Sequence, residues 1–198
     1  IVYFWGNGVS WPQLALMTVM YIITGMGITV GDHRLFTHKS FSAGPIVTMV
    51  IGIIGSMAAE GSLLRWCAAH RRHHQFSDHD GDPHSPHLHD HGHGLRGIIS
   101  GFWHAHMGWI FDPPGESLDR YVPDLLRDRR IRAISELFPL WVGLGFVIPA
   151  LLGGLLNLAI GAPFWTGVFL GFIWGGLVRV MVVHHITWSV NSVCHIWG

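Results

Sequence analysis

The sequence predicts an all-α integral membrane protein, in which a transmembrane helical stem carries a cytoplasmic helical cap. Only 12% of the 198 residues are charged, which is about half the fraction in a typical soluble domain. Of the 24 charged residues, 23 lie between Asp32 and Glu136, and the sequences on either side are almost purely apolar. Acidic and basic residues balance within this charged block, so we expect no nucleic acid partner.

Three apolar stretches are long enough to cross a membrane, which takes about 20 helical residues. They cover about residues 11–31, 137–160 and 163–187. Residues 45–59 form a shorter apolar stretch, for which we expect an interfacial position. Eleven of the twelve Lys and Arg lie within residues 32–136, so the positive-inside rule predicts that this cap is cytoplasmic.

The first group of candidate metal ligands is a pair of histidines that follows the first apolar stretch. His33 and His38 lie within the sequence HRLFTH. Residues five apart are separated by about 140° around an α-helix, so these side chains do not share a helical face. They converge on one site only if the helix ends between them, and Gly31 and Asp32 are compatible with such an end.

Two further groups contain the remaining candidates. His70, His73 and His74 cluster on one face of a predicted helix, because residues three and four apart are neighbours there. Neutral imidazole is the commonest protein ligand for metal ions, and three imidazoles on one turn suggest two ions that share this face. Near the end of the last apolar stretch, Asn191 and His195 lie one helical turn apart.

A site shared by all three groups restricts the topology. If residues 45–59 crossed the bilayer, the first two groups would lie on opposite sides of it. If they do not cross, the hairpin of the last two stretches returns His195 to the side of the other histidines. We therefore predict a histidine-rich dimetal site at the cytoplasmic end of the stem, and its imidazole donors suit iron, copper or zinc.

Five motifs in order resemble those of a known family: HRLFTH, HRRHHQFSD, GDPH, GFWHAHMGW and TWSVNSVCH. They are similar to those of the integral-membrane fatty acyl desaturases, in particular the stearoyl-CoA desaturase-like, delta-9 type. The resemblance implies O2-dependent introduction of a cis double bond into a saturated chain of an acyl-CoA or acyl-lipid, with delta-9 as the expected position. It implies a di-iron centre in which Asn191 holds an ion through water. The implied iron ligands are His33, His38, His70, His73, His74 and His195.

The resemblance also implies further parts. The family has a third histidine box, similar to HNxHH, after the last of these motifs, and another transmembrane helix before the first apolar stretch. We therefore expect residues 1–198 to be a partial desaturase domain. Ala68 stands where the animal acyl-CoA enzymes carry Arg, which leaves the acyl carrier open. No cluster of redox cysteines occurs, so we expect a separate electron donor such as cytochrome b5 or ferredoxin.

Other residues are expected to support the site. Metal-bound histidines commonly donate their second ring N–H to a carboxylate or carbonyl oxygen, and our candidates for such orienting roles are Asp32, Asp78, Asp82, His106 and His184. The acyl chain needs a narrow apolar tunnel, for which the candidate lining residues are Trp103, Trp109 and Trp188. We expect the histidines between His79 and His93 to lie in a hydrated loop rather than to capture metal for transport.

Two other functions compete with desaturation at this point. A membrane di-iron hydroxylase of alkyl or fatty acyl chains uses the same kind of histidine motifs, and only the resemblance favours the desaturase. A divalent-metal transporter would place its ligands within the spans, near the midplane of the bilayer. Residues 11–31 and 137–160 contain no charged side chain, which argues against transport.

Overall fold

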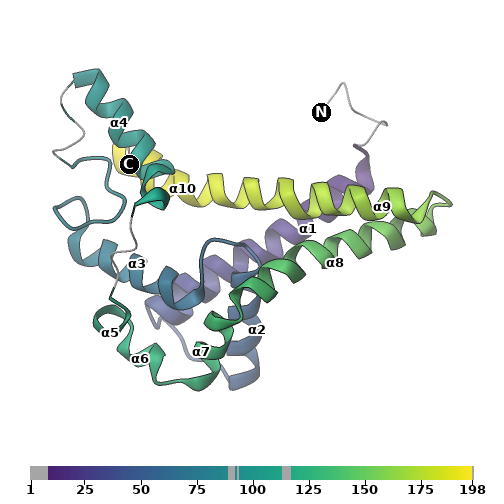
Figure 1. Ribbon diagram of the computed structural model, residues 1–198, viewed down its shortest axis with the longest axis horizontal. Helices are drawn as coiled ribbons and strands as arrows, with labels where there is room; N and C mark the ends of the chain where they lie inside the picture. The colour runs from purple at the N-terminus through teal and green to yellow at the C-terminus, as the bar shows by residue number, and fades with distance from the viewer. Residues whose placement is uncertain (1–8, 89–91, 93, 113–116, 198) are drawn as a thin grey trace.

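The computed structural model describes residues 9–88, 92, 94–112 and 117–197. These residues form helices joined by turns and loops, and no strand occurs among them. The all-α prediction is therefore confirmed. A long stem contains α1, α8, α9 and α10, and α3 to α6 gather at one end of it (Figure 1).

The first helix of the stem changes its geometry along its length. α1 (Trp11–Met26) continues without a break into a π-helix, η2 (Gly27–Thr37), and together they form an apolar helix of 27 residues. Pro12 lies in the first turn of α1, where its missing N–H has no helical partner to lose. A π-helix has hydrogen bonds between residues five apart, and such turns occur frequently at functional sites.

The other two long helices form a hairpin. α8 (Phe138–Ala159) precedes a continuous helix of 34 residues, which consists of α9 (Phe164–Gly171), η5 (Phe172–Val178) and α10 (Arg179–Trp197). α8 and α9 approach so closely that a Cβ atom on Gly153 would collide with the backbone carbonyl of Gly167. The glycine therefore allows this approach because it has no side chain. Small residues at such contacts are typical of helices that pack in membranes.

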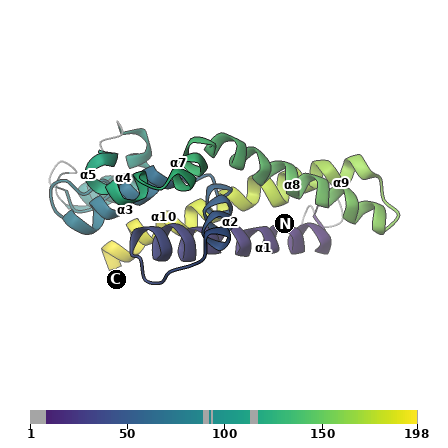
Figure 2. The ribbon, with the colours of Figure 1, turned by 90° about the horizontal axis from the view of Figure 1, so that it is seen from below.

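Among the described residues, three helices are long and apolar enough to cross a membrane, namely Trp11–Thr37, Phe138–Ala159 and Phe164–Trp197. The shorter helix α2 (Pro45–Ser56) runs across the long axis of the stem in both views (Figures 1 and 2). The interfacial position of this segment, the boundaries of the crossing segments and the cytoplasmic orientation of the cap stay predictions.

The part of the cap formed by residues 63–68 and 118–134 packs with residues 35 and 36 around an apolar cluster. Phe36 from η2 meets Leu63 and Cys67 from α3, Val122 from the segment between two short helices, and Ile134 from α7, all of them buried. The cap helices are α3 (Leu63–Phe76), α4 (Gly94–His106), η4 (Gly108–Phe111), α5 (Leu118–Tyr121), α6 (Pro123–Leu126) and α7 (Arg129–Glu136). This cluster fixes η2 against α3, the two elements that carry most of the candidate ligands.

Arg179 is the one charged residue outside the charged block of the sequence, and it is completely buried. Its guanidinium donates hydrogen bonds to the carbonyl oxygens of Met57 and Gly145, both at 2.7 Å, and of Gly175 at 3.1 Å. A buried cation needs such acceptors to offset its loss of water. Arg179 therefore ties the end of α2 and the middle of α8 to α10.

Candidate metal centre

The first imidazole group joins η2 to α3. One ring nitrogen from each of His33, His38, His70 and His74 lies within 4.8 Å of the others. The ring centroids of His33 and His38 are 4.5 Å apart, those of His38 and His74 4.7 Å, and those of His70 and His74 4.6 Å. Four nitrogens at this spacing can enclose one metal ion.

The way in which His33 and His38 meet differs from the prediction. No helix end separates them, because η2 extends to Thr37 and His38 is its C-cap residue. The backbone N–H of His38 donates to the carbonyl oxygen of His33 at 3.0 Å, which is the hydrogen bond of a π-turn. This turn stacks residues five apart, so both side chains reach one site without a break in the helix.

α3 supplies the other half of this group. His70 and His74 are one helical turn apart, and their Nε2 atoms lie 3.1 Å from each other. The ring of Trp66 stacks on His70 with the centroids 4.9 Å apart, and its Nε1–H donates to the Glu60 carboxylate at 3.2 Å. Burial, together with the neighbouring imidazoles, lowers the pKa of His70 to about 2, so this ring is neutral and able to bind a cation.

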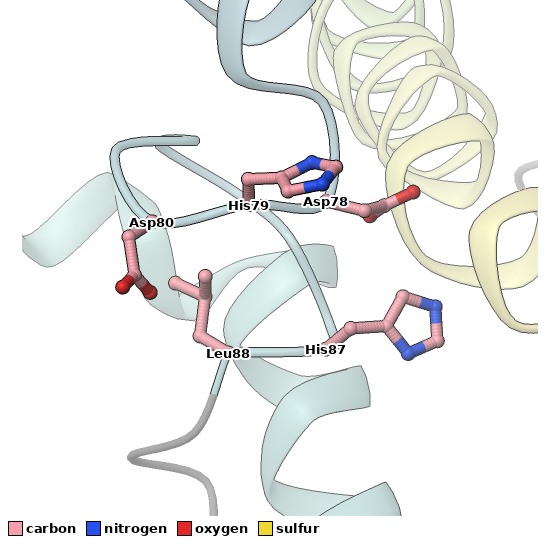
Figure 3. Close-up of a pocket in the computed structure, with 5 residues that line it drawn as sticks. All are labelled: Asp78, His79, Asp80, His87 and Leu88. Atoms are coloured by element: carbon pink, nitrogen blue, oxygen red, sulfur yellow. The ribbon is translucent and has the colours of Figure 1, made fainter.

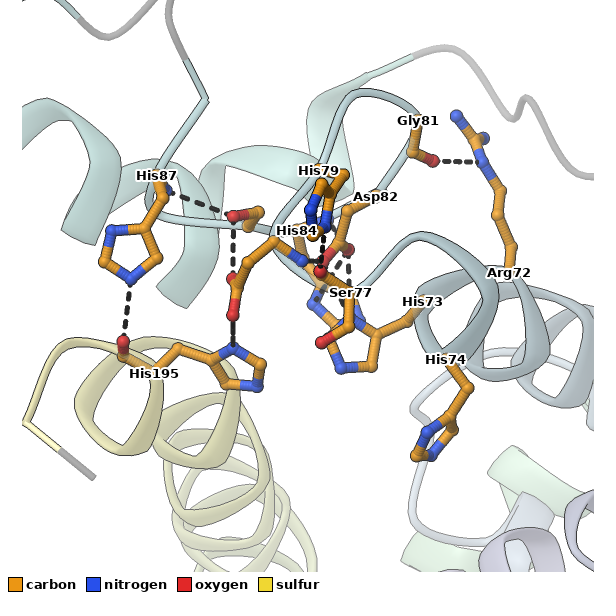
Figure 4. A network of polar contacts seen from close by, with 12 residues as sticks. Arg72, His73, His74, Ser77, His79, Gly81, Asp82, His84, His87 and His195 are labelled. Carbon is orange, nitrogen blue, oxygen red and sulfur yellow. Dashed lines mark hydrogen bonds and ion pairs between the residues drawn. The ribbon is translucent and has the colours of Figure 1, made fainter.

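A second group begins at His73, which faces the loop after α3. Its Nδ1–H donates to both carboxylate oxygens of Asp82, at 2.9 and 3.0 Å (Figure 4). Burial opposes ionisation of Asp82, but the hydrogen bonds from His73 and from the backbone N–H groups of Asp78 and His84 outweigh it and lower the pKa to about 2. Asp82 thus leaves Nε2 of His73 for a metal ion.

The end of α10 brings His195 to the same place. Its ring centroid lies 5.1 Å from that of His73, and its Nδ1–H donates to Asp78 at 3.0 and 3.1 Å (Figure 4). Burial opposes ionisation of Asp78, but hydrogen bonds from Ser85 and His195 lower its pKa. The predicted orienting contacts of Asp78 and Asp82 are therefore present, although the ligand roles themselves stay predictions.

The sequence profile of the fatty acid desaturase family matches residues 9–197, nearly the whole chain. The chain belongs to this family. Together with the three long apolar helices, membership of the fatty acid desaturase family makes it an integral membrane protein. It also explains why the histidine motifs recur at the ends of apolar helices.

Individual relatives support the assignment to the fatty acid desaturase family. A hex-5-enoyl-[acyl-carrier protein] acetylenase of Moorena producens is 37% identical over 198 residues, which is 100% of this chain and 60% of the relative. An sn-1 stearoyl-lipid 9-desaturase of Synechocystis is 34% identical over 96% of this chain and 52% of its own length. A chloroplastic palmitoyl-monogalactosyldiacylglycerol delta-7 desaturase of Arabidopsis thaliana is also 34% identical, over 96% and 45%. The chain thus spans about half the length of these desaturase-family relatives.

Other predicted residues lie at the edge of the two groups. Asp32 is buried, and its Oδ1 has no hydrogen-bond partner. His184 donates from Nε2 to the carbonyl oxygen of Ala58 at 3.0 Å, a contact between α10 and the loop after α2. Asn191 is half-buried one turn before His195. Among the described hydrogen bonds, none joins Asp32 or His184 to a candidate ligand, so the predicted orienting role is not seen for these two.

His106 holds α4 against α10. Its Nδ1 lies 2.9 Å from the Ser192 hydroxyl, its Nε2 lies 3.0 Å from Nδ1 of His185, and Phe102 stacks on its ring. His106 thus contacts α10 at Ser192, three residues before His195, and not at the ring of His195. The structure therefore gives His106 a packing role next to the site.

The three tryptophans predicted to line a tunnel are dispersed. Trp103 is 57% exposed on α4, Trp109 packs edge-on to His84 at 5.4 Å, and Trp188 packs against His184 at 4.9 Å. An apolar groove of about 270 Å³ instead lies between the first stem helix and α10. It is lined by Tyr21, Ile22, Gly25, Met26, Ile28, Thr29, Val183, Ile186 and Thr187.

The loop after α3 forms a small polar pocket of about 150 Å³, lined by Asp78, His79, Asp80, His87 and Leu88 (Figure 3). His87 is exposed, and its Nε2–H donates to the carbonyl oxygen of His195 at 2.7 Å. His89, His91 and His93, which we expected to be hydrated, lie outside the described residues.

Three further candidates at the site are not apparent from the sequence patterns. Glu60 lies ten residues before His70 and contacts Trp66. Arg71 lies within the second histidine motif, and His84 lies in the loop that follows it. The GDPH motif was the one signal that could have pointed to His84, because it places the histidine two residues after Asp82.

Proposed function

We propose that the protein takes part in O2-dependent desaturation of a fatty acyl chain and that its two imidazole groups hold two iron ions. The main support is the division of one helical turn of α3 between two neighbouring groups. His70 and His74 belong to the first group, whereas His73 lies 5.1 Å from His195 in the second. Membership of the fatty acid desaturase family supports the same chemistry.

The donor set fits the proposed ions. Six imidazoles and no thiolate favour iron, copper or zinc over magnesium or calcium. Metal–nitrogen bonds of about 2.0–2.1 Å place the rings of two imidazoles on one ion roughly 4.5–5 Å apart. The ring pairs of the two groups, from 4.5 Å for His33 and His38 through 5.1 Å for His73 and His195 to 5.5 Å for His38 and His70, lie close to this range.

The reaction removes two hydrogen atoms, that is two protons and two electrons, from adjacent methylene groups, while O2 is reduced to two molecules of water. The other two electrons come from a separate donor, such as cytochrome b5 or ferredoxin, and the other two protons come from the solvent. Two bound iron ions would supply the oxidising power that an unactivated C–H bond requires. The protein residues hold the ligands in place, exclude water and position the chain.

The acyl chain is proposed to lie in the apolar groove between the first stem helix and α10. Val183 and Ile186 line the groove, and so does Thr187, whose hydroxyl donates to the carbonyl oxygen of Val183 at 3.0 Å. The groove therefore lies along the part of α10 that precedes Asn191 and His195.

The acyl carrier in this proposal is a membrane lipid, and the double bond forms at the delta-9 position. The Synechocystis relative is named a stearoyl-lipid 9-desaturase and the Arabidopsis relative a lipid delta-7 desaturase. Ala68 is uncharged and completely buried under the cap. This position therefore does not present a charge to an acyl-CoA. The cytoplasmic orientation rests on the excess of Lys and Arg in the cap.

The test is expression of the gene in a host that lacks its own desaturase, followed by gas chromatography and mass spectrometry of the lipids. We expect a cis-monounsaturated chain and about two irons per purified protein. His38→Ala should abolish the product, and Arg65→Ala, at an exposed position on α3, should not. A hydroxylated chain would favour the hydroxylase, and exchangeable zinc without any lipid product would refute the proposal.

A further inference from the structure

Four arginines gather in the short segment that leads into the stem helix α8. They are Arg127, Arg129, Arg130 and Arg132, and all four are exposed. The first directly follows α6, and the other three belong to α7. We call these four residues the α7 arginine cluster. None of them contacts the candidate ligands or the apolar groove in the described part of the chain, so the proposed function leaves them without a role.

α7 turns its apolar side into the cap and its arginines outward. Ile131 and Ile134 are buried in the apolar cluster of the cap. Because residues three apart lie on one face of an α-helix, these two isoleucines share a face, and Arg129 and Arg132 share another. The buried isoleucines fix the rotation of α7 about its own axis, and this rotation keeps Arg129 and Arg132 at the surface.

Three of the four arginines form no ion pair or side-chain hydrogen bond within the described residues. The exception is Arg130, whose guanidinium pairs with Asp128 at 2.8 Å. The other acid of this segment, Glu136, is exposed one turn after Arg132, and the described contacts contain no ion pair between them. Arg127, Arg129 and Arg132 thus present positive charge that no acid in the described structure neutralises.

The length of α8 places the cluster at the level of the lipid headgroups. α8 has 22 residues and is about 33 Å long at 1.5 Å per residue, whereas the hydrocarbon core is about 30 Å thick. The chain turns back at Gly161, so a crossing of the bilayer takes up nearly all of α8. Phe138 then lies near the edge of the core, and α7 lies in or beside the polar layer, which adds about 5–7 Å on each side.

The neighbouring helix α2 adds an apolar surface at the same level. It packs against α7 through Gly52, where a Cβ atom would lie 3.5 Å from the side chain of Ile134, and it runs across the stem next to the start of α8 (Figures 1 and 2). Ile46, Val47 and Val50 on α2 are about half exposed or more. An exposed apolar face next to basic side chains is typical of surfaces that bind anionic membranes.

We propose that Arg127, Arg129 and Arg132 bind the phosphate groups of anionic phospholipids in the leaflet around the first turn of α8. A guanidinium suits this ligand because it donates two parallel hydrogen bonds to phosphate oxygens. Basic side chains next to a transmembrane helix also attract anionic lipids by charge. The ligand is a lipid of the surrounding bilayer and not the acyl substrate, so the inference does not depend on the metal centre or on desaturation.

The test measures the preference of the purified protein for phosphatidylglycerol over phosphatidylcholine. The protein is reconstituted into vesicles that contain both lipids, and electron paramagnetic resonance of a spin-labelled form of each lipid gives the ratio of their association constants. We expect the wild type to prefer phosphatidylglycerol and high salt to weaken this preference. Replacement of Arg127, Arg129 or Arg132 by Gln should reduce the ratio by up to about fivefold for each residue, the factor that one basic side chain contributes at an anionic surface.

The matched control is the double variant Arg65→Gln and Arg96→Gln, because these arginines are also exposed but belong to α3 and α4. Replacement of the three arginines by Lys keeps the charge and should retain most of the preference. Single Gln variants serve where the triple variant does not fold.

Three results would overturn the inference. They are an unchanged lipid preference in the folded Gln variants, an equal loss in the control, and a wild type without any preference. Soluble glycerol phosphate at the same concentration should not displace the labelled lipid; if it does, the cluster binds free phosphate instead. Displacement by a polyglutamate peptide would assign the cluster to an acidic protein. Because the readout is lipid binding and not activity, each of these results leaves the proposed function standing.

Discussion

Arg71 offers the sharpest test of how the cap is held together. It lies between two candidate ligands in sequence, but its guanidinium donates away from them, to the carbonyl oxygens of Phe36 at 2.8 Å and Tyr121 at 2.9 Å. It also forms a bidentate ion pair with Asp124, with nitrogen–oxygen distances of 2.6 and 3.1 Å. One side chain thus joins η2, α3 and the α5–α6 segment.

The expected cost of Arg71→Ala follows from the exposure of this ion pair. Removal of one partner of a buried pair costs about 3–5 kcal/mol, whereas an exposed pair contributes about 0–1 kcal/mol. The side chains of Arg71 and Asp124 are 20% and 30% exposed, and Lys39 continues to pair with Asp124 at 2.7 Å. We therefore expect a loss of about 2–3 kcal/mol, which lowers the melting midpoint of a protein of this size by about 4–12 °C.

Thermal unfolding of the purified protein in detergent measures this loss. Arg71→Lys keeps the charge but cannot form the two-pronged contact, so its midpoint should lie between those of the wild type and the alanine variant. Arg65→Ala, at an exposed position on the same helix, is the matched control. The reasoning fails if the midpoint of Arg71→Ala falls by no more than that of the control.

Three other predictions concern a titration, a buried cation and the topology. Burial raises the pKa of Glu60 to about 7 against the opposing hydrogen bond from Trp66. The unfolded carboxyl loses its proton near 4.5, so the stability of the fold should decrease as the pH rises between these values. Glu60→Gln should remove that slope, and an unchanged slope of melting midpoint against pH would contradict this. Arg179→Met leaves the Met57 and Gly145 carbonyl oxygens without their donor and should cost about 1–3 kcal/mol for each of them, with Arg179→Lys intermediate. A methionine variant as stable as the wild type would count against this expectation. The topology test uses a Cys194→Ser background, which removes the exposed thiol but keeps buried Cys67. In this background Ser42→Cys and Ser62→Cys should react with an impermeant maleimide from the same side of the membrane. Reaction from opposite sides would exclude a site shared by the two histidine groups.

The parts of the fold that depend on length and spacing could be predicted from the sequence. Long apolar stretches of the sequence correspond to the three long apolar helices among the described residues. The i, i+3, i+4 spacing of His70, His73 and His74 places them on one turn of α3, as the geometry of an α-helix requires. The acidic residues expected to orient imidazoles were in part identified as well, since Asp78 and Asp82 contact His195 and His73.

The parts that depend on contacts between distant segments could not be predicted. Asp32 is a candidate for orienting an imidazole, and its carboxylate packs against Gly55 of α2, a contact between distant segments that the sequence does not indicate. The hydrogen bonds of Arg179 go to carbonyl groups more than thirty residues away in sequence, which no local pattern indicates. His84 belongs to an irregular loop, where no periodicity indicates which side chains are buried.

The two histidine motifs on η2 and α3 bring their ligands together by two different helix geometries. On α3, an α-helical turn brings His70 and His74 together because they are four residues apart, and it leaves the adjacent His73 facing the loop and the second group. On η2, the ligands are five residues apart, and an α-helix would point them in different directions. The π-turn between the His33 carbonyl and the His38 N–H removes this difference. The five-residue spacing of these two ligands therefore requires the π-helical geometry. An α-helix would have to end between His33 and His38 to bring them together, whereas the structure has a continuous π-helix there.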